Sequence, residues 1–163
     1  MSDHVDPIEW SRRLWEAGKG PEPDYFAAMA AVLRLEQLVG LALDRLVREH
    51  GLSRTGYLIL VTLYLREDRT LSMGQLSKRL LLHPTTVSLV TDKLQARELV
   101  VRSPHPTDRR TILAELTDEG ARTLATVSEA LGEVNYGLEG VSDRMAITLT
   151  EVIRQVRESM GDA

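Results

Sequence analysis

The chain has no cysteine, a single phenylalanine and only 4% aromatic residues among its 163 residues. Without cysteine there is no disulfide, no thiolate metal site and no cysteine-based redox sensor, and the cytoplasm is the simplest expected compartment. Few runs resemble strands, whereas Leu, Ala, Glu and Arg are abundant, which predicts a mainly helical fold. Apolar residues make up 43% of the chain, enough for the core of one continuous folding unit.

The sequence also lacks the marks of a secreted or membrane protein. The acidic start, residues 1–6, has neither the basic region nor the apolar stretch of a signal peptide. The nearly unbroken apolar run at residues 57–65 is too short to cross a bilayer, which needs about 20 residues. We therefore expect no membrane partner, and we expect residues 57–65 to lie in a buried helix that Ser53 opens.

Signatures of an enzyme are missing as well. No glycine-rich phosphate loop is present, and no nucleophile has a visible base and orienting group. The four histidines are scattered along the chain at His4, His50, His83 and His105. We therefore predict no catalytic residue, no metal site and no cofactor.

The net charge of −4 argues against a nucleic-acid partner until its distribution is considered. Residues 75–110 contain seven basic and three acidic side chains, a net charge of +4, so the rest of the chain carries −8. A DNA-binding segment on an acidic scaffold has this pattern. An unevenly charged solvated surface has it too, and charge alone leaves both interpretations open.

Two helices are expected in the first 50 residues. Residues 6–17 have helix-compatible apolar spacing and are followed by the Gly- and Pro-rich segment 18–23. Asp24 is a good N-cap for a long helix that runs to about His50, where Gly51 provides the stop. Apolar side chains cover more than one stripe of this helix, which indicates that it packs on two sides.

The C-terminal third also contains helices with extensive apolar faces. From Thr117 onward, apolar residues recur at steps of three and four. These helices can form an intramolecular hairpin. Alternatively, both chain ends contribute to a helical dimer interface, which we favour because few other elements remain to cover the apolar faces. The expected organisation has dimerisation helices in residues 1–50 and 118–163 on either side of a central region, residues 51–117.

The central region begins with two short helices joined by a tight turn. Ser72 and Gln75 form a capping box, in which the Ser72 hydroxyl accepts from the Gln75 amide and the Gln75 side chain bonds back to Ser72. The helix that starts there should end near Leu80. Pro84 then stands in the first turn of a second helix, where its missing N–H costs least.

The second of these helices has a polar outer face. Val87, Val90 and Leu94 form its predicted buried stripe. The side chains left outside are Thr85, Thr86, Ser88, Leu89, Asp92 and Lys93. Small hydroxyl side chains near the N-terminal end suit a helix that approaches base edges and phosphates in the major groove, where the positive end of the helix dipole helps. Such a cluster also occurs at ordinary helix starts.

A β-hairpin is predicted directly after this helix. Residues 99–102 and 111–116 are strand-like, and the polar loop 103–110 between them contains two prolines and an Arg pair. Arg109 or Arg110 can enter a narrow minor groove, and Asp108 can orient the arginine through a salt bridge. The alternative is a surface turn with an ordinary ion pair, but the neighbouring helix-turn-helix favours a DNA-binding wing.

Residues 71–120 resemble the MarR regulators. The matching segments are LSMGQLSKRL at 71–80, TTVSLVTDKL at 85–94, DRR at 108–110 and LTDEG at 116–120. The wing segment is the most specific of these, and the helical flanks agree over most of the chain. The resemblance implies a mainly α winged helix-turn-helix fold and a triangular homodimer that binds inverted repeats in double-stranded DNA.

The resemblance also implies roles for particular residues. Thr85, Thr86 and Ser88 would lie on the recognition helix, and Arg109 or Arg110 would be the minor-groove residue. The full set of candidate DNA contacts is Pro84, Thr85, Thr86, Ser88, Leu89 and Lys93 on the helix, Asp108, Arg109 and Arg110 in the wing, and Ser72, Gln75, Lys78, Arg79 and His105 toward the DNA backbone. A small aromatic or phenolic effector would bind between the dimerisation and DNA-binding regions and release a repressor from its operator.

Two features depart from the usual pattern of the family. Members carry glycine between the recognition helix and the wing, where this chain has Glu98, so we expect the helix to end differently. The N-terminal helix with Trp10 and Trp15 is similar to that of the urate-responsive subgroup, but Leu58 stands where that subgroup has an acidic ligand residue. The two tryptophans are therefore weak ligand candidates, and stapling this helix onto the dimer is the favoured role.

A different class of function stays open. A helical interaction module can carry a winged helix that binds protein instead of DNA. That alternative predicts no binding to nucleic acid either before or after substitution of Arg109 and Arg110.

Overall fold

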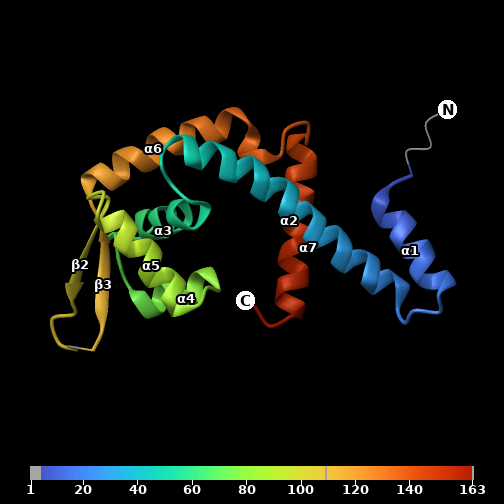
Figure 1. Ribbon diagram of the computed structural model, residues 1–163, viewed down its shortest axis with the longest axis horizontal. Helices are drawn as coiled ribbons and strands as arrows, with labels where there is room; N and C mark the ends of the chain where they lie inside the picture. The colour runs from blue at the N-terminus through green and yellow to red at the C-terminus, as the bar shows by residue number, and fades with distance from the viewer. Residues whose placement is uncertain (1–4, 109, 163) are drawn as a thin grey trace.

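The computed structural model describes residues 5–108 and 110–162 as a set of helices with one small sheet (Figure 1). The elements in chain order are α1 Pro7–Ala17, α2 Pro23–Glu49, α3 Arg54–Tyr64, β1 Thr70–Ser72, α4 Met73–Leu80, α5 Pro84–Gln95, β2 Val100–Pro104, β3 Ile112–Leu116, α6 Asp118–Glu133, the 3-10 helix η1 Asn135–Gly137, and α7 Asp143–Ser159. The predicted fold class, mainly α with a small β-hairpin wing, is confirmed.

The hydrophobic core lies where α3, α4, α5, the sheet and α6 meet. Ile59, Leu60 and Leu63 of α3 are fully buried, as predicted. The prediction that the whole run 57–65 lies in a buried helix is wrong, because Tyr64 and Leu65 at its end are 52% and 77% exposed. Val47 at the end of α2 is also fully buried and belongs to the same cluster. The long helix is therefore anchored to the core at its C-terminal end, and the rest of α2 leads away from the core toward α1 (Figure 1).

The sheet has three antiparallel strands in the order β1-β3-β2. The hairpin of β2 and β3 pairs Val100 with Leu116 and Pro104 with Ile112, which confirms the predicted wing. Strand β1 is not predicted by the sequence analysis, and it pairs with β3 through Leu71 and Ala114. A three-residue strand is too short to show a period of two, so only the contact with β3 defines it.

Most helix starts follow the predicted caps. The capping box is complete, since Ser72 Oγ accepts from the Gln75 amide at 3.2 Å and Gln75 Oε1 accepts from the Ser72 amide at 2.8 Å. Ser53 caps α3 through the Gly56 amide. The predicted cap Asp24 is wrong, because α2 begins one residue earlier at Pro23, whose restricted φ suits the first helical position.

Glu98 adopts the left-handed conformation that glycine usually supplies, with φ of +59°. The expectation that the helix ends differently because of Glu98 is therefore wrong. Its carbonyl accepts from the Thr117 hydroxyl at 2.7 Å, and the next residue, Leu99, is buried. These contacts hold the turn against the side-chain penalty of a left-handed residue.

Two apolar faces have no covering partner among residues 5–108 and 110–162. Met29, Val32 and Leu33 of α2 are each more than half exposed. No residue of α7 is buried, and Ile147 and Met160 are 71% and 79% exposed. An intramolecular hairpin would cover the apolar stripe of α7, so that alternative does not describe this structure.

By length and composition, α2 is the one helix among residues 5–108 and 110–162 that could cross a membrane. An 18-residue window of it reaches a mean hydropathy of 1.6, and only 6% of that window is buried. The unbroken apolar stretch of this helix, residues 25–33, is only nine residues long, and charged residues interrupt the helix after it. A helix of a soluble protein passes the same test, so the expected lack of a membrane partner stays a prediction.

Candidate nucleic-acid interface

Helices α4 and α5 form the helix-turn-helix. The Ser77 hydroxyl donates to the Leu82 carbonyl at 2.5 Å and closes the turn, in which Leu81 is left-handed. Val87 and Leu94 are buried against the core, and Val90 is partly buried, as predicted. The outer face of α5 is consequently free to meet another molecule.

The predicted recognition-helix residues lie on that outer face. Pro84, Thr85, Thr86, Leu89 and Lys93 are exposed, and Ser88 is half-buried. Their surface is mostly polar at the N-terminal end, where backbone N–H groups and the helix dipole favour a phosphate. Assignment of these residues to DNA contact stays a prediction.

His83 is a residue at this surface that the sequence analysis missed. Its ring Nδ1 accepts from the Thr85 amide at 3.3 Å, so it is the N-cap of α5. The position before Pro84 could have pointed to it, because the residue before a helix-starting proline is the N-cap. The ring is exposed at the tip of the recognition helix.

In the wing, Asp108 holds the backbone. Its carboxylate accepts from the Thr111 hydroxyl at 2.7 Å and from the Arg110 amide at 3.0 Å. These bonds, together with the charge of nearby His105, hold the pKa of Asp108 below its ordinary value. Among the described residues the Asp108 carboxylate makes no ion pair, and of Arg110 it bonds only to the amide. The other candidate partner, Arg109, lies outside the described residues, so the orienting salt bridge stays a prediction.

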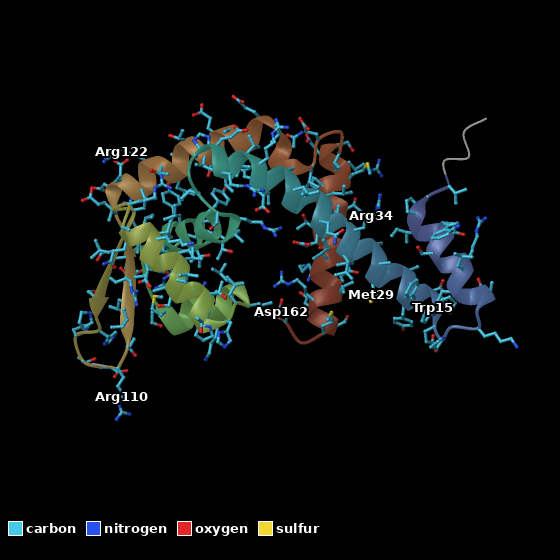
Figure 2. All side chains as sticks on the ribbon, viewed as in Figure 1. Trp15, Met29, Arg34, Arg110, Arg122 and Asp162 are labelled. Atoms are coloured by element: carbon cyan, nitrogen blue, oxygen red, sulfur yellow. The ribbon has the colours of Figure 1, made fainter. Side chains whose placement is uncertain are left out.

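Arg110 lies at the far tip of the wing and points away from the molecule (Figure 2). Arg109, the other candidate, lies outside the described residues. His105 is half-buried, and its ring Nδ1 accepts from the Thr107 amide at 3.3 Å. The wing therefore presents at least one guanidinium at its end and keeps its histidine within the turn.

The wing and the recognition helix are tied together. Arg102 of β2 forms an ion pair with Asp92 of α5, and its side chain is less exposed than that of its partner. The sequence analysis placed Asp92 on the outside and did not predict this pair, since the two residues are separated by a turn whose geometry the sequence does not define. The ion pair orients the hairpin relative to α5.

The candidates for contact with the DNA backbone fall into two groups. Ser72 and Gln75 use their side-chain oxygens to accept hydrogen bonds from each other's amides at the start of α4. Lys78 and Arg79 are exposed in the last turn of α4, where their charges also favour the helix dipole. Only the second pair is free to offer charge to a phosphate.

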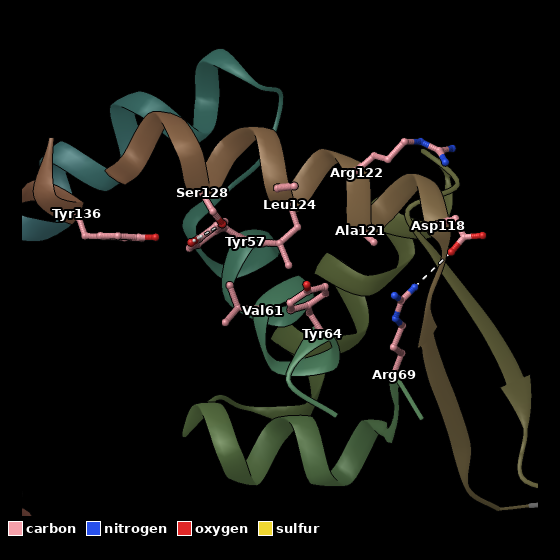
Figure 3. Close-up of a pocket in the computed structure, with 11 residues that line it drawn as sticks. Tyr57, Val61, Tyr64, Arg69, Asp118, Ala121, Arg122, Leu124, Ser128 and Tyr136 are labelled. Atoms are coloured by element: carbon pink, nitrogen blue, oxygen red, sulfur yellow. Dashed lines mark hydrogen bonds and ion pairs between the residues drawn. The ribbon is translucent and has the colours of Figure 1, made fainter. Parts of the chain in front are cut away.

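A cavity of about 700 Å³ lies between α3 and α6. Figure 3 shows Tyr57 and Tyr64 from α3 and Tyr136 from η1 around it. These are three of the four tyrosines in the chain, and this concentration of scarce aromatic residues is a signal that the sequence analysis did not use. The Tyr57 hydroxyl lies 3.2 Å from Ser128 Oγ of α6, so the cavity wall joins the two helices.

One end of this cavity is charged. Arg69 Nη1 donates to Asp118 Oδ1 at 3.2 Å, and the Arg69 guanidinium carbon lies 5.9 Å from the centre of the Tyr64 ring (Figure 3). Arg69 directly precedes β1, and Asp118 is the first residue of α6. Aromatic walls beside a guanidinium group suit a planar anion.

Trp15 lies on α1, far from Arg122 at the cavity and from Arg110 at the wing tip (Figure 2). Trp10 belongs to the same helix. The Trp15 ring stacks on Phe26 of α2 with centroids 4.5 Å apart, and its Nε1 donates to the Pro21 carbonyl at 2.8 Å. Trp15 therefore staples α1 to α2 of its own chain. Trp10 is 56% exposed.

Comparison with known proteins places this arrangement in a family. The MarR family model matches residues 52–112, which run from the start of α3 to the start of β3. A MarR family regulator of Streptomyces coelicolor, Sco5413, is 28% identical and superposes with a TM-score of 0.75 over 85% of this chain and 96% of its own. Residues 52–112 of the chain therefore match the MarR family, and the fold agrees over most of the chain.

Further MarR-family relatives agree. The transcriptional regulator MhqR of Bacillus subtilis is 29% identical over 70% of this chain and 78% of its own length. Two other curated regulators match over about half of their own length. The structure of Sco3205 from S. coelicolor, a MarR family regulator in complex with DNA, has the same fold, with 24% identity and a TM-score of 0.72 over 81% of this chain and 84% of that one.

The MarR-family proteins that the chain resembles are transcriptional regulators and not enzymes. Within residues 5–108 and 110–162, no group of three or more His, Asp or Glu side chains is arranged to hold a metal ion. The polar outer surfaces and the cavity between α3 and α6 are therefore the candidate binding sites of this protein.

Proposed function

We propose that the protein is a cytoplasmic, sequence-specific DNA-binding repressor that acts as a homodimer. The observation that carries this proposal is the combination of two surfaces on one rigid unit. The exposed polar end of α5 and the wing with Arg110 at its tip are connected through the pair Asp92–Arg102. A helix for the major groove and a cation for the minor groove are the two parts that such recognition needs.

The proposed division of labour follows the exposed surfaces. Residues 51–117 bind DNA, and residues 1–50 and 118–163 dimerise through the open apolar faces of α2 and α7. A second copy would cover these faces and remove a large apolar area from water. A two-fold dimer presents two recognition helices, so the operator is a pseudo-palindrome with half-sites about 10 bp apart. A dimer seated over a promoter represses by excluding the polymerase.

The proposed effector is a small aromatic or phenolic anion in the cavity between α3 and α6. Its ring would meet the tyrosines, and its negative charge would compete with Asp118 for Arg69. Because Arg69 leads into the wing sheet and Asp118 opens α6, loss of their pair would alter the joint between the DNA-binding and dimerisation regions. An effector that binds the altered arrangement more tightly shifts the protein away from DNA.

Fluorescence anisotropy tests the proposal. The purified dimer is titrated against duplex from its own upstream region and against a scrambled duplex, at two salt concentrations. We expect preference for the upstream duplex and salt-sensitive binding, weakened in the Arg110→Ala variant and in the Arg109→Ala/Arg110→Ala variant. Each lost phosphate contact should lower the slope of log affinity against log salt by about 0.9.

A charge-matched control is available at the opposite end of the molecule. Arg13 on α1 is exposed, and within the part of the chain that the structure describes it pairs only with Glu9 of its own helix. Arg13→Ala changes the net charge as much as Arg110→Ala does and should leave DNA affinity unchanged. Absence of DNA binding at low salt by a folded protein would favour the alternative, a winged-helix module that binds protein.

A further inference from the structure

The turn that follows the recognition helix is held from both long helical regions. It consists of Arg97, Glu98 and Leu99, directly after the end of α5. On one side Arg97 reaches the C-terminal end of α2, and on the other side the start of α6 contacts Glu98 and Leu99. We call these three residues the junction turn. Nothing in the winged helix itself requires these outward contacts.

The contact with α2 is made by one guanidinium. Arg97 Nη1 donates to the Gly51 carbonyl, and Nη2 donates to the His50 carbonyl at 3.3 Å. His50 is the C-cap of α2 and Gly51 is the next residue, so both carbonyls lie just beyond the negative end of the helix dipole. Arg97 thus satisfies groups that water would otherwise satisfy, and it ties the end of α5 to the end of α2.

The contact with the start of α6 is made by its N-cap residue, Thr117, which donates to two backbone carbonyls of the turn. The Thr117 hydroxyl donates to the Glu98 carbonyl at 2.7 Å, and the Thr117 amide donates to the Leu99 carbonyl at 3.2 Å. Gly120 of α6 lies so close that an added Cβ would overlap the Leu99 carbonyl oxygen. The junction turn is therefore fixed tightly on the α6 side, and Arg97 is its adjustable contact with α2.

A second tie between α2 and the winged helix lies on α3. Arg54, the first residue of α3, pairs with Glu36 at 2.8 Å and with Asp44 at 3.5 Å, both on α2. Apolar packing around Val47 attracts without a preferred direction, whereas hydrogen bonds are directional. Two directional ties, one on α3 and one beyond α5, define the angle between α2 and the winged helix better than one does.

From this geometry we propose that Arg97 is a positioning residue for operator recognition. It sets the angle between the recognition helix and α2, and it thereby sets the half-site spacing that the dimer accepts. The proposal rests on the proposed function, because spacing has a meaning only for a dimer on DNA. Arg97 itself touches no base, so its substitution should leave the preferred half-site sequence unchanged.

The first arm of the test measures the angle in the free protein. The chain has no cysteine, so Arg45→Cys on α2 and Thr85→Cys at the start of α5 take two spin labels at defined places. Labelled protein is diluted into excess unlabelled protein, and the distance distribution within one chain is recorded. Arg97→Ala should broaden the distribution, and Arg97→Lys should broaden it too, because one ammonium cannot reproduce the planar pair of bonds.

The second arm measures affinity for duplexes whose half-sites are about 9, 10, 11 or 12 bp apart. The ratio of affinities between the best and the next spacing should fall at least about fivefold in Arg97→Ala. Arg97→Lys keeps the charge, so it separates positioning from general attraction to DNA. In Arg97→Lys the ratio of affinities between the best and the next spacing should fall as much as in Arg97→Ala. Affinity for the duplex with the best spacing should fall less than in Arg97→Ala.

The outcomes separate the two proposals. A distance distribution in Arg97→Ala that superimposes on that of the unsubstituted protein overturns the positioning role. Broadening without loss of spacing discrimination overturns the link to operator choice. If the protein shows no preference for any DNA sequence, the proposed function is wrong. The spin-label distances still decide whether Arg97 sets the angle between α5 and α2.

Discussion

Replacing Gly120 with alanine should destabilise the protein by about 2 kcal/mol. The added Cβ would overlap the Leu99 carbonyl oxygen and would lie 2.7 Å from Leu116 Cδ1 and 3.0 Å from the Leu99 carbonyl carbon. The close group is backbone, so it cannot turn aside as a side chain can. Overpacking of this kind costs roughly 1–3 kcal/mol, and shifting Leu99 would also weaken its bond from the Thr117 amide, worth about 1 kcal/mol. The higher helix propensity of alanine offsets about 1 kcal/mol of this destabilisation.

The same helix supplies a matched control. Gly132 is exposed near the end of α6, and an added Cβ there meets nothing within 4 Å. Gly132→Ala should therefore stabilise the protein by up to about 1 kcal/mol through helix propensity alone. The two variants have the same composition and differ only in the surroundings of one methyl group.

Urea and thermal unfolding followed by circular dichroism measure the difference, at one fixed protein concentration because dimerisation adds to stability. For a chain of this size a change of 1 kcal/mol moves Tm by roughly 2–4 °C. We expect a Tm lower by about 6 °C for Gly120→Ala and slightly higher for Gly132→Ala. Equal stability of the two variants would refute the close approach of α6 to the junction turn.

Two further predictions concern α5 and the wing. Thr91 is fully buried in α5, and its hydroxyl has no hydrogen-bond partner among the described residues. Thr91→Val should therefore leave the free energy of unfolding unchanged or raise it by about 1 kcal/mol, with Thr62→Val, which removes a bonded hydroxyl, as the control. A clear loss of stability in Thr91→Val would show that the hydroxyl is satisfied. The pKa of Asp108 is lowered from 3.8 in the folded wing, so its bonds to the turn are present above that pH and are lost as the pH falls through the folded pKa. The Arg110 amide resonance should therefore stay constant from neutral pH to about 5 and move only below about 4, and an unchanged amide resonance in Asp108→Asn would contradict the role of the carboxylate.

Much of the local structure could be predicted because its cause lies within a few residues. The capping box of Ser72 and Gln75, the cap Ser53 and the proline at the start of α5 each act over three or four positions, and all of them are confirmed. The hairpin was predicted from its two apolar runs and the loop between them, with strand bounds shifted by one or two residues. Asp24 failed as a cap because Pro23 offered a better first helical residue.

Features of the candidate site that join distant segments could not be predicted in this way. The pair Asp92–Arg102, the cavity between α3 and α6 and the strand β1 depend on where whole elements come to lie. Each side chain involved also has an ordinary interpretation as a solvated surface residue. Only its distance to a partner from another element distinguishes the two roles.

By itself, therefore, the sequence determined the fold class, the order of the helices, most of their caps and the position of a helix-turn-helix followed by a wing. These follow from hydrophobic periodicity and from the short reach of caps and turns. The tertiary structure alone decided that Glu98 takes a left-handed conformation without glycine, and that the end of α5 is tied to both α2 and α6. A strained residue persists only where surrounding contacts outweigh its penalty, and those contacts come from residues that are distant in sequence.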